Sequence, residues 1–351
     1  MKVSIAIGVV TKDWDEMSSF VLEAERLGVD SVWSAENWAH DAATPLAYLA
    51  AKTTRIRLGS GIMQSVTRTP ALFAMTAMTL AHMSGDRFIL GLGASGPQVV
   101  EGWHGVPFTH TLERIREIAD ILRIVQRRDH LTYKGEVYEL PLPGGQGKAL
   151  RTSAPLVAPI PVYLATLTPK GLRLTGEIGD GWVGTSFIPE HADAFFSHIA
   201  EGAAKAGRTL DDIDLGAGGS VEFGDDVEKL VAARKPGMAF TLGAMGSRTT
   251  NFYNAAYRRS GYDDVGREVQ ALWIDGDRDA AIARIPDEMV LAANMIGTEE
   301  MVLGRIRAYR DAGINTLRVH PEGKTLAERI ETLARTMQLV ERVNAEVPSP
   351  A

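Results

Sequence analysis

Cysteine is absent from the 351-residue chain. Its absence excludes disulfide bonds, thiolate metal ligands, iron–sulfur clusters and cysteine nucleophiles. The chain also lacks an apolar run that approaches the roughly 18 residues of a membrane helix. Its N-terminal segment runs directly into a strand-like stretch, without the long apolar region of a signal peptide. We therefore expect a cytoplasmic protein that does not engage a membrane.

Positive charge is in the minority, with 37 lysines and arginines against 44 aspartates and glutamates and a formal net charge of −7. No basic run of useful length occurs, so a nucleic-acid partner is not expected, although a local anion pocket remains compatible with this charge. The motifs HExxH, GxSxG and GxxxxGK followed by Ser or Thr do not occur. Histidines and carboxylates show no metal-ligand spacing, so we expect no metal site.

Short aliphatic or β-branched runs alternate with segments of helical periodicity along the chain. Strands are predicted over residues 3–8, 31–35, 55–62, 87–93, 161–166, 181–185, 213–221 and 315–320. Helices are predicted over residues 14–27, 43–52, 70–83, 111–127, 169–178, 189–206 and 325–346. Apolar strands that alternate with amphipathic helices indicate a parallel sheet covered by helices. Eight such units predict an α/β fold, a closed (β/α)8 TIM barrel that spans residues 1–351 as one domain.

Two segments interrupt this alternation and are predicted to be insertions within the barrel domain. Residues 130–160 are rich in proline and glycine, and YKGEVYEL within them predicts a small hairpin. Residues 224–310 are predicted to be mostly helical and lie between the seventh and eighth strands. Insertions of this kind commonly form the wall of an active site.

Functional residues of such a barrel lie at the carboxyl ends of its strands. The second predicted strand ends in SAENWAHD, which places Glu36 and His40 at the barrel mouth as candidate acids, bases or substrate anchors. The alternative is a solvated loop whose polar residues are incidental. Arg68, which follows the third strand, is predicted to face either an anion or a neighbouring carboxylate.

The fourth predicted strand ends in GLGASG, residues 91–96. This sequence matches GxGxxG, but the dinucleotide-binding fingerprint opens a clean helix in the first βα unit. Here the match closes the fourth unit, and PQVVEGWHGVPF after it does not predict a clean helix. Small residues at this point would let a flat ring lie against the mouth, with Glu101 and His104 nearby in the sequence. Tight barrel packing is the alternative explanation for these small residues. At the end of the third strand, Gly59 and Gly61 indicate a bulge or a close approach of the backbone to a ligand, with a simple strand-ending turn as the alternative.

The fifth and sixth predicted strands lead into ATLTPKG, residues 165–171, and GWVGTS, residues 181–186. Threonines before Pro169 indicate a helix N-cap, and a helix N-terminus with free N–H groups is a ready anion site. A cofactor phosphate is predicted to bind across these two strand ends, with ordinary capping as the alternative. In the helix at 70–83, the three methionines Met75, Met78 and Met83 are predicted to pack in the core.

Two longer stretches, AENWAHDAATPLAYLAAKTTRIRLGSGI and TRTPALFAMTAMTLAHMSGDRFILGLGASGPQVVEGWHG, resemble the luciferase-like monooxygenase superfamily. The closest resemblance is to its branch of oxidoreductases that depend on coenzyme F-420, a 5-deazaflavin. That branch includes methylenetetrahydromethanopterin reductase and deazaflavin-dependent glucose-6-phosphate and alcohol dehydrogenases. The resemblance covers residues 1–215 well and residues 295–345 weakly, and it is most specific at residues 86–105.

The resemblance implies a bacterial-luciferase-like barrel, often a homodimer packed through early helices, with a cis peptide between Gly61 and Ile62 behind the deazaflavin ring. By position, it places the ring near Gly61, Ile62, Met63, Ala94, Ser95 and Gly96. It places the cofactor phosphate near Ala165, Thr166, Thr168, Gly171, Gly184 and Thr185. Proton transfer is left between Glu36, His40 and Glu101. The sugar-phosphate branch has a histidine where Glu36 stands and a tryptophan where His40 stands, so glucose 6-phosphate is not the expected substrate.

The leading hypothesis is reversible hydride transfer between C5 of the deazaflavin and a small organic substrate, in which the cofactor supplies the chemistry and the protein the positioning. Glu36→Gln and His40→Ala are each expected to lower turnover with little change in cofactor affinity. Two alternatives keep the fold: a reduced-FMN monooxygenase that activates oxygen, and a barrel that binds a flavin without catalysis. An isomerase or aldolase would need a lysine at a strand end, whereas Lys170 lies in the first turn of a helix.

Overall fold

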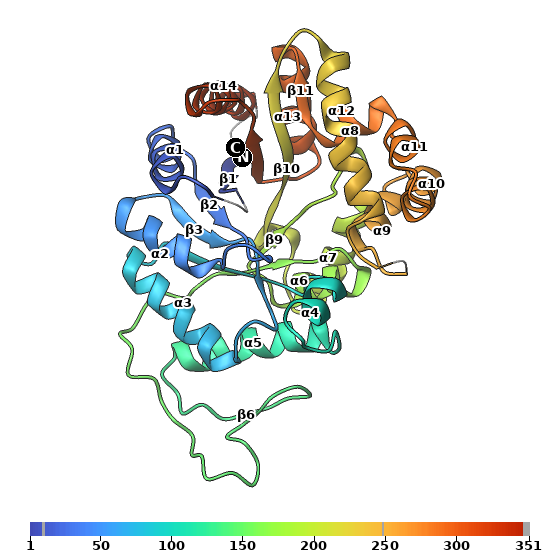
Figure 1. Cartoon of the computed structure of the whole chain (residues 1–351). Helices are drawn as coiled ribbons and strands as arrows, with labels where there is room; N and C mark the ends of the chain where they lie inside the picture. The colour runs from blue at the N-terminus through green and yellow to red at the C-terminus, as the bar shows by residue number, and fades with distance from the viewer. Residues whose placement is uncertain (9–10, 248, 347–351) are drawn as a thin grey trace.

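A computed structural model of the chain, which describes residues 1–8, 11–247 and 249–346, has a closed barrel of parallel strands with helices outside it (Figure 1). The barrel strands are β1 (Lys2–Ala6), β2 (Ser31–Ser34), β3 (Arg57–Ser60), β5 (Phe88–Gly93), β8 (Val162–Ala165), β9 (Gly181–Val183), β10 (Asp214–Phe223) and β12 (Thr316–Pro321). They pair in this order, and β12 pairs with both β10 and β1, which closes the ring. The predicted (β/α)8 barrel is confirmed, and each predicted strand overlaps one barrel strand.

Helices cover the outside of the ring. They are α1 (Trp14–Arg26), α2 (Ala43–Lys52), α3 (Pro70–Ser84), α5 (Thr111–Gln126), α6 (Pro169–Ile178), α7 (Asp193–Lys205), α13 (Glu299–Asp311) and α14 (Leu326–Ala345). A shorter helix, α4 (Pro97–Gly102), directly follows β5. The helix predicted over 189–206 begins instead as a 3-10 turn, Pro189–His191, before α7. The short helix α4 was not predicted, and its first residue is a proline, which suits the first helical position.

The barrel wall separates two apolar regions, because successive residues of a strand point to opposite sides of a sheet. Outward-facing side chains pack with the helices in one large core, which includes Val32, Leu58 and Leu317. The inward-facing apolar side chains form a separate cluster of Trp33, Ile89, Tyr163 and Val183.

Glycines on the inner wall make room for these side chains. A Cβ atom at Gly59 would lie 2.4 Å from the Trp33 ring, and one at Gly91 would lie 1.9 Å from the carbonyl oxygen of Ser60. Packing inside the barrel therefore explains these two glycines. A Cβ at Gly61 would lie 3.3 Å from the nearest Trp33 atom, so the same clash does not arise there.

The first insertion contains the predicted hairpin. Its strands β6 (Tyr133–Lys134) and β7 (Glu139–Leu140) pair antiparallel, which confirms that prediction. The buried carboxylate of Glu117 on α5 accepts hydrogen bonds from the backbone N–H groups of Glu136 at 2.7 Å and Tyr138 at 2.8 Å. These bonds attach the hairpin to the barrel.

The second insertion is mainly helical, as predicted. It contains α8 (Val227–Gly243), α9 (Phe252–Arg259), α10 (Asp263–Ile274), α11 (Arg278–Ala283) and α12 (Asp287–Ala293). These helices share an apolar cluster of their own, which includes Leu242, Val269 and Met289. A short strand that was not predicted, β11 (Met295–Gly297), extends the sheet beside the end of β10.

The methionines of α3 do not all pack in the core. Met78 is buried, but Met75 and Met83 are 58% and 50% exposed. The prediction was wrong for these two residues, because the helix turns them to its outer face together with Leu72, which is 45% exposed. Within the described ranges, no helix is long and apolar enough to cross a membrane.

Candidate functional site

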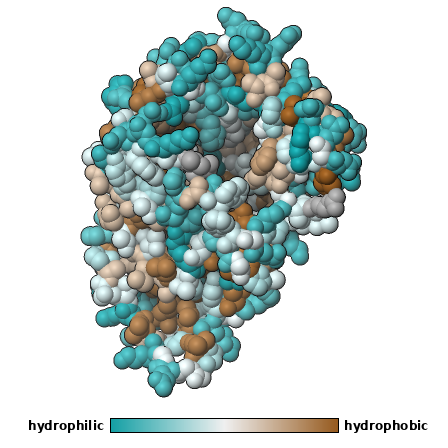
Figure 2. Space-filling model, viewed as in Figure 1, coloured by the Kyte–Doolittle hydropathy of each residue, from teal (hydrophilic) through white to brown (hydrophobic). Residues whose placement is uncertain are grey.

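The carboxyl ends of the barrel strands form the mouth where barrel enzymes bind their ligands. The space-filling surface is hollowed between the ring of strands and the helices of the second insertion (Figure 2). Most of the predicted site residues lie in the segments that follow β2, β3, β5, β8 and β9.

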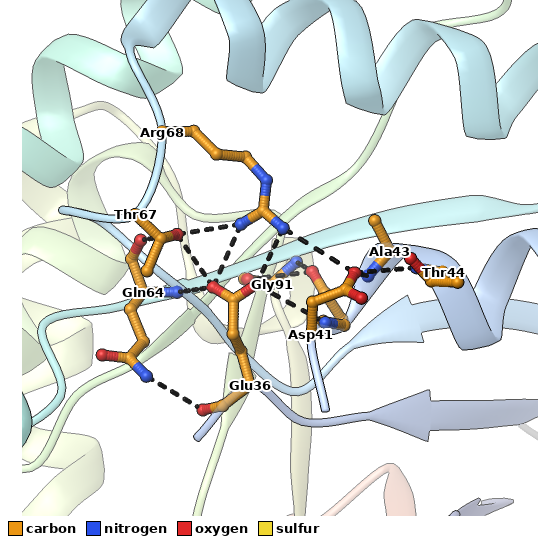
Figure 3. A network of polar contacts seen from close by, with 10 residues as sticks. Glu36, Asp41, Ala43, Thr44, Gln64, Thr67, Arg68 and Gly91 are labelled. Carbon is orange, nitrogen blue, oxygen red and sulfur yellow. Dashed lines mark hydrogen bonds and ion pairs between the residues drawn. The ribbon is translucent and has the colours of Figure 1, made fainter. Parts of the chain in front are cut away.

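Glu36 follows β2, and its carboxylate is held from several sides (Figure 3). Its Oε2 accepts hydrogen bonds from the backbone N–H of Gln64 at 3.0 Å, from the Thr67 hydroxyl at 2.8 Å and from Arg68 Nη1 at 3.0 Å. Arg68 Nη2 lies 2.8 Å from Oε1, and the Glu36 and Arg68 side chains are only 5% and 12% exposed. Arg68 was predicted to face either an anion or a neighbouring carboxylate, and in the structure it contacts the carboxylate of Glu36.

The main chain of Glu36 binds the same segment as its side chain. Its N–H donates to the carbonyl oxygen of Ile62 at 3.1 Å, and its carbonyl oxygen accepts from Gln64 Nε2 at 3.2 Å. The Gly61–Ile62 peptide lies between β3 and β4 (Met63–Gln64) and is cis, as the resemblance implied. Glu36 thus holds residues 62–64 through its N–H, its carbonyl oxygen and its carboxylate.

Ile62, Gly93 and Ala165 come together from three neighbouring strand ends. A Cβ atom at Gly93 would lie 3.0 Å from Ile62 Cδ1 and 3.5 Å from the Cβ of Ala165. The small residues 94–96 follow in partly exposed positions, and Ser95 has a φ of 61°. Together these residues form a platform with little side-chain volume, which suits a planar ring.

Two predicted cofactor residues direct their side chains away from the mouth. The Met63 side chain is fully buried in the large core. Thr166 is 6% exposed, and its hydroxyl lies 2.7 Å from that of Thr175 on α6. Its carbonyl oxygen accepts from Trp182 Nε1 at 3.0 Å. These two residues support the mouth, and their side-chain groups are not offered to a ligand.

The N-terminus of α6 keeps the properties of an anion site. Thr168 is its N-cap, as predicted, and accepts the Gly171 N–H at 3.1 Å. Thr185, at the end of neighbouring β9, is exposed. The Gly184 N–H donates to the carbonyl oxygen of Gly216 at 2.7 Å, so it is engaged within the barrel. Pro169 has no N–H, and the Gly171 N–H is held by Thr168, so the donors that this helix end leaves for an anion are the Lys170 N–H and the hydroxyls of Thr168 and Thr185.

His40 and Glu101 lie on different segments of the mouth. His40 Nε2 accepts the backbone N–H of Thr11 at 3.2 Å, and its ring centroid lies 5.2 Å from that of Trp14. Glu101, on α4, is exposed and accepts the backbone N–H of Phe108 at 3.1 Å. Across the described residues, Glu36, His40 and Glu101 form no hydrogen bonds with one another. The structure does not join the three proton-transfer candidates into one cluster.

The second insertion walls the mouth beside β8 and β9. Arg259 on α9 donates to the carbonyl oxygen of Leu167, directly before the α6 N-cap. Tyr257 is buried beside Ser186, and burial raises its pKa to about 12. The first residue of α9, Phe252, packs against Phe108 with ring centroids 6.3 Å apart. The sequence offered no register for this segment, so Arg259 was not predicted as a site residue.

Arg318 and His320, two polar residues on β12, were also missed. Thr316, Arg318 and His320 alternate with Leu317 and Val319, a period-two pattern that places the polar set inside the barrel. The His320 side chain keeps contact with solvent, but protein atoms surround much of the ring. The loss of hydration that results, together with the nearby charge of Arg318, lowers the pKa of His320 to about 4. The signal was present in TLRVHP and became meaningful once this strand closed the ring.

Over residues 1–8, 11–247 and 249–346, no three His, Asp or Glu side chains gather in a way that could hold an ion.

Comparison with known proteins places this architecture in context. Residues 2–316 match the model of the family described as luciferase-like monooxygenase. A Mycobacterium tuberculosis protein, named as a candidate coenzyme F-420-dependent oxidoreductase, is 42% identical over 325 residues, which cover 90% of this chain and 93% of that protein. The 5,10-methylenetetrahydromethanopterin reductase of Archaeoglobus fulgidus is 28% identical over 85% of this chain and 87% of its own. Among solved structures, the coenzyme F-420-dependent tetrahydromethanopterin reductase of Methanopyrus kandleri superposes with a TM-score of 0.81 at 22% identity, over 97% of this chain and 98% of that one.

Proposed function

The chain belongs to the luciferase-like monooxygenase family, and we propose that it is an oxidoreductase that transfers a hydride between coenzyme F-420 and a small organic substrate. The observation that carries this proposal is the 42% identity, over 90% of the chain, to a relative named for dependence on this coenzyme. The relatives also include a reductase of 5,10-methylenetetrahydromethanopterin, at 28% identity.

The residues of the mouth fit the cofactor. Ile62, Gly93, Ala165 and residues 94–96 form a low platform for its tricyclic ring, and the α6 N-terminus with Thr168 and Thr185 offers donors to its phosphate. Arg259, half-buried beside Leu167, adds a positive charge next to these donors. When bound, the cofactor supplies the hydride chemistry, and the protein orients it and excludes competing reactions.

The three proton-transfer candidates, Glu36, His40 and Glu101, differ in the number of hydrogen bonds that their side chains already make. The Glu36 carboxylate is enclosed by Gln64, Thr67 and Arg68, which supports a positioning role at the segment behind the ring. His40 and Glu101 each accept a single backbone N–H. Each therefore keeps the capacity to exchange a proton with a substrate at the mouth. We assign proton transfer to this pair and positioning to Glu36.

The test is a titration of the purified full chain with F-420 and, separately, with FMN, followed by calorimetry. We expect F-420 to bind at micromolar concentration or tighter and FMN to bind at least tenfold more weakly. Bleaching of oxidised F-420 by members of an alcohol and aldehyde panel, or recovery of its absorbance from the reduced form with acceptor substrates, then identifies turnover. Tighter binding of FMN with oxygen consumption would favour the monooxygenase alternative. Binding without turnover across the panel would favour a non-catalytic barrel.

We also propose a homodimer. The exposed apolar stripe of Leu72, Met75 and Met83 runs along α3, one of the early helices, and its exposure in a single chain supports burial against a second copy.

A further inference from the structure

Arg318 is a positive charge inside the barrel for which the described chain provides no counter-charge. Its side chain is partly exposed, and the only hydrogen bond that this side chain makes within the described residues is a long one, 3.4 Å from Nη1 to the carbonyl oxygen of Gly184. Its guanidinium carbon lies 5.7 Å from the centroid of the Trp33 ring. No carboxylate of the described residues lies within 4.0 Å of it. Burial alone lowers its pKa, to about 10, so it remains charged at neutral pH.

The other arginine of the barrel interior shows the usual arrangement. Arg57, on β3, has Asp30 at 2.5 Å and Asp214 at 3.7 Å from Nη2. Both arginines are only partly exposed, and charges that are withdrawn from water in this way are normally paired, because an unpaired charge loses hydration without compensation. The same barrel thus neutralises one interior arginine with two carboxylates and leaves the other without one. An unpaired interior cation at a ligand-binding mouth indicates that its partner arrives with the ligand.

The guanidinium also lies beside the two segments at which the cofactor is proposed to bind. Its Nη2 is 3.8 Å from the position that a Cβ atom at Gly61 would take, and its Nη1 faces Gly184. These two glycines belong to the segments proposed for the ring and for the phosphate. The Arg318 guanidinium lies between these two segments, so its expected partner is the cofactor and not a substrate on the outer face of the ring.

We propose that Arg318 pairs with the negative charge that the pyrimidine ring of the deazaflavin carries in its reduced form. This inference rests on the proposed function. When the substrate C–H bond breaks, its hydride forms a new C–H bond at C5 of the ring, and the oxidised substrate releases its remaining proton to a base. The ring gains two electrons and one proton, so a neutral pyrimidine becomes an anion shared by N1 and the C2 carbonyl oxygen. A fixed cation beside that anion favours the reduced form over the oxidised form.

The experiment compares the affinities of the folded full chain for oxidised and reduced F-420 by anaerobic calorimetry. The variants are Arg318→Met, which removes the charge at similar volume, and Arg318→Lys, which keeps it. We expect Arg318→Met to weaken binding of the reduced form about tenfold more than binding of the oxidised form. For a two-electron couple this tenfold change corresponds to a potential about 30 mV more negative. Arg318→Lys should retain most of the preference of the unsubstituted protein.

The control is Arg307→Met, which removes an exposed arginine that pairs with Glu346 on the outer surface. It should leave the ratio of the two affinities unchanged. A ratio for Arg318→Met within twofold of the unsubstituted protein overturns the inference, even if KM for carboxylate substrates rises, because the arginine would then serve the substrate. Should Arg318→Met fail to fold by circular dichroism, Arg318→Gln is compared by the same criterion. Absence of F-420 binding to the unsubstituted chain is a different result, which overturns the proposed function itself.

Discussion

The carboxylate of Glu36 and the backbone N–H of Gln64 are joined by a 3.0 Å hydrogen bond. This bond links the end of β2 to the segment after the Gly61–Ile62 peptide, and Arg68 and Thr67 bind the same carboxylate. The relationship supports the positioning role proposed for Glu36 at the barrel mouth. It also changes the effect expected from its removal.

Glu36→Gln should destabilise the protein and weaken cofactor binding together. An amide replaces one acceptor oxygen with a donor that faces Arg68 and the Gln64 N–H, so hydrogen bonds to a charged group worth about 2 kcal/mol are lost. We expect a lower Tm by circular dichroism and a Kd for F-420 raised about tenfold. The control, Glu101→Gln, alters an exposed carboxylate and should leave Tm unchanged. Loss of turnover in Glu36→Gln with unaltered Tm and Kd would instead assign proton transfer to Glu36.

His40→Ala should reduce kcat while leaving the affinity for F-420 nearly intact. Removal of a general acid or base costs roughly a hundredfold in rate. Steady-state kinetics with the best substrate of the panel, combined with cofactor titration, measures both quantities. His82→Ala is a matched control, because that histidine is exposed in the last turn of α3. Equal kcat values for the two variants would remove His40 from the reaction.

Gly91→Ala should impair folding severely. The added methyl group would lie 1.9 Å from the carbonyl oxygen of Ser60, a backbone atom that cannot move without opening the barrel. Overpacking of a well-filled core costs about 1–3 kcal/mol, and a backbone clash places this variant at or beyond the upper end. Gly102→Ala meets nothing within 4 Å and should be neutral or stabilising by about 0.5–1 kcal/mol. Thermal unfolding of both variants tests the contrast, which fails if their Tm values agree.

His320 should make the protein without cofactor less stable in acid. Its folded-state pKa of about 4 lies below the ordinary value of 6.5, so the folded protein binds this proton less readily than the unfolded chain. The contribution of neutral His320 is therefore present above pH 6.5 and is lost as pH falls toward 4. His320→Asn should flatten the dependence of Tm on pH within this window, whereas His82→Asn should not. Superimposable curves for His320→Asn and the unsubstituted protein are the contradicting result.

Charge placed on the outer face of α3 should separate the proposed dimer. Met75→Glu introduces a carboxylate at a residue that is 58% exposed in the single chain, so the monomer should fold normally. We expect light scattering after gel filtration to give the mass of a dimer for the unsubstituted protein and of a monomer for the variant. Phe240→Glu, at an exposed aromatic residue on α8, should remain dimeric. A monomeric unsubstituted protein would exclude the dimer directly.

The agreement between sequence and structure depends on the range of the interactions involved. Thr168 before Pro169 was recognised as an N-cap because capping involves residues within one helical turn. The hairpin at Tyr133–Leu140 was recognised for the same reason. Met75 and Met83 were assigned to the core wrongly, because hydrophobicity alone does not tell which face of a helix is covered.

In the candidate site too, local features were predicted from the sequence, whereas contacts between distant segments were not. Glu36 and Arg68 are 32 positions apart in the chain. Both were singled out from the sequence, but their contact with each other was one of two open possibilities. Thr166 was predicted to lie near the cofactor phosphate, and the structure adds that its hydroxyl is bonded to the Thr175 hydroxyl on α6. Arg318 and His320 were overlooked, since nothing local distinguishes an interior charged residue of the last strand from an exposed one.

The sequence by itself determined the alternation of strands and helices, the number of barrel units and the positions of the strand ends, because period-two and helical patterns are local properties of the chain. Only the tertiary structure decided which polar groups neutralise one another at the mouth. Closure of the ring through β12, β10 and β1 places Arg318 beside Gly61 and Gly184, residues far from it in the chain. Electrostatic pairing depends on distances across that ring, and no local pattern contains them.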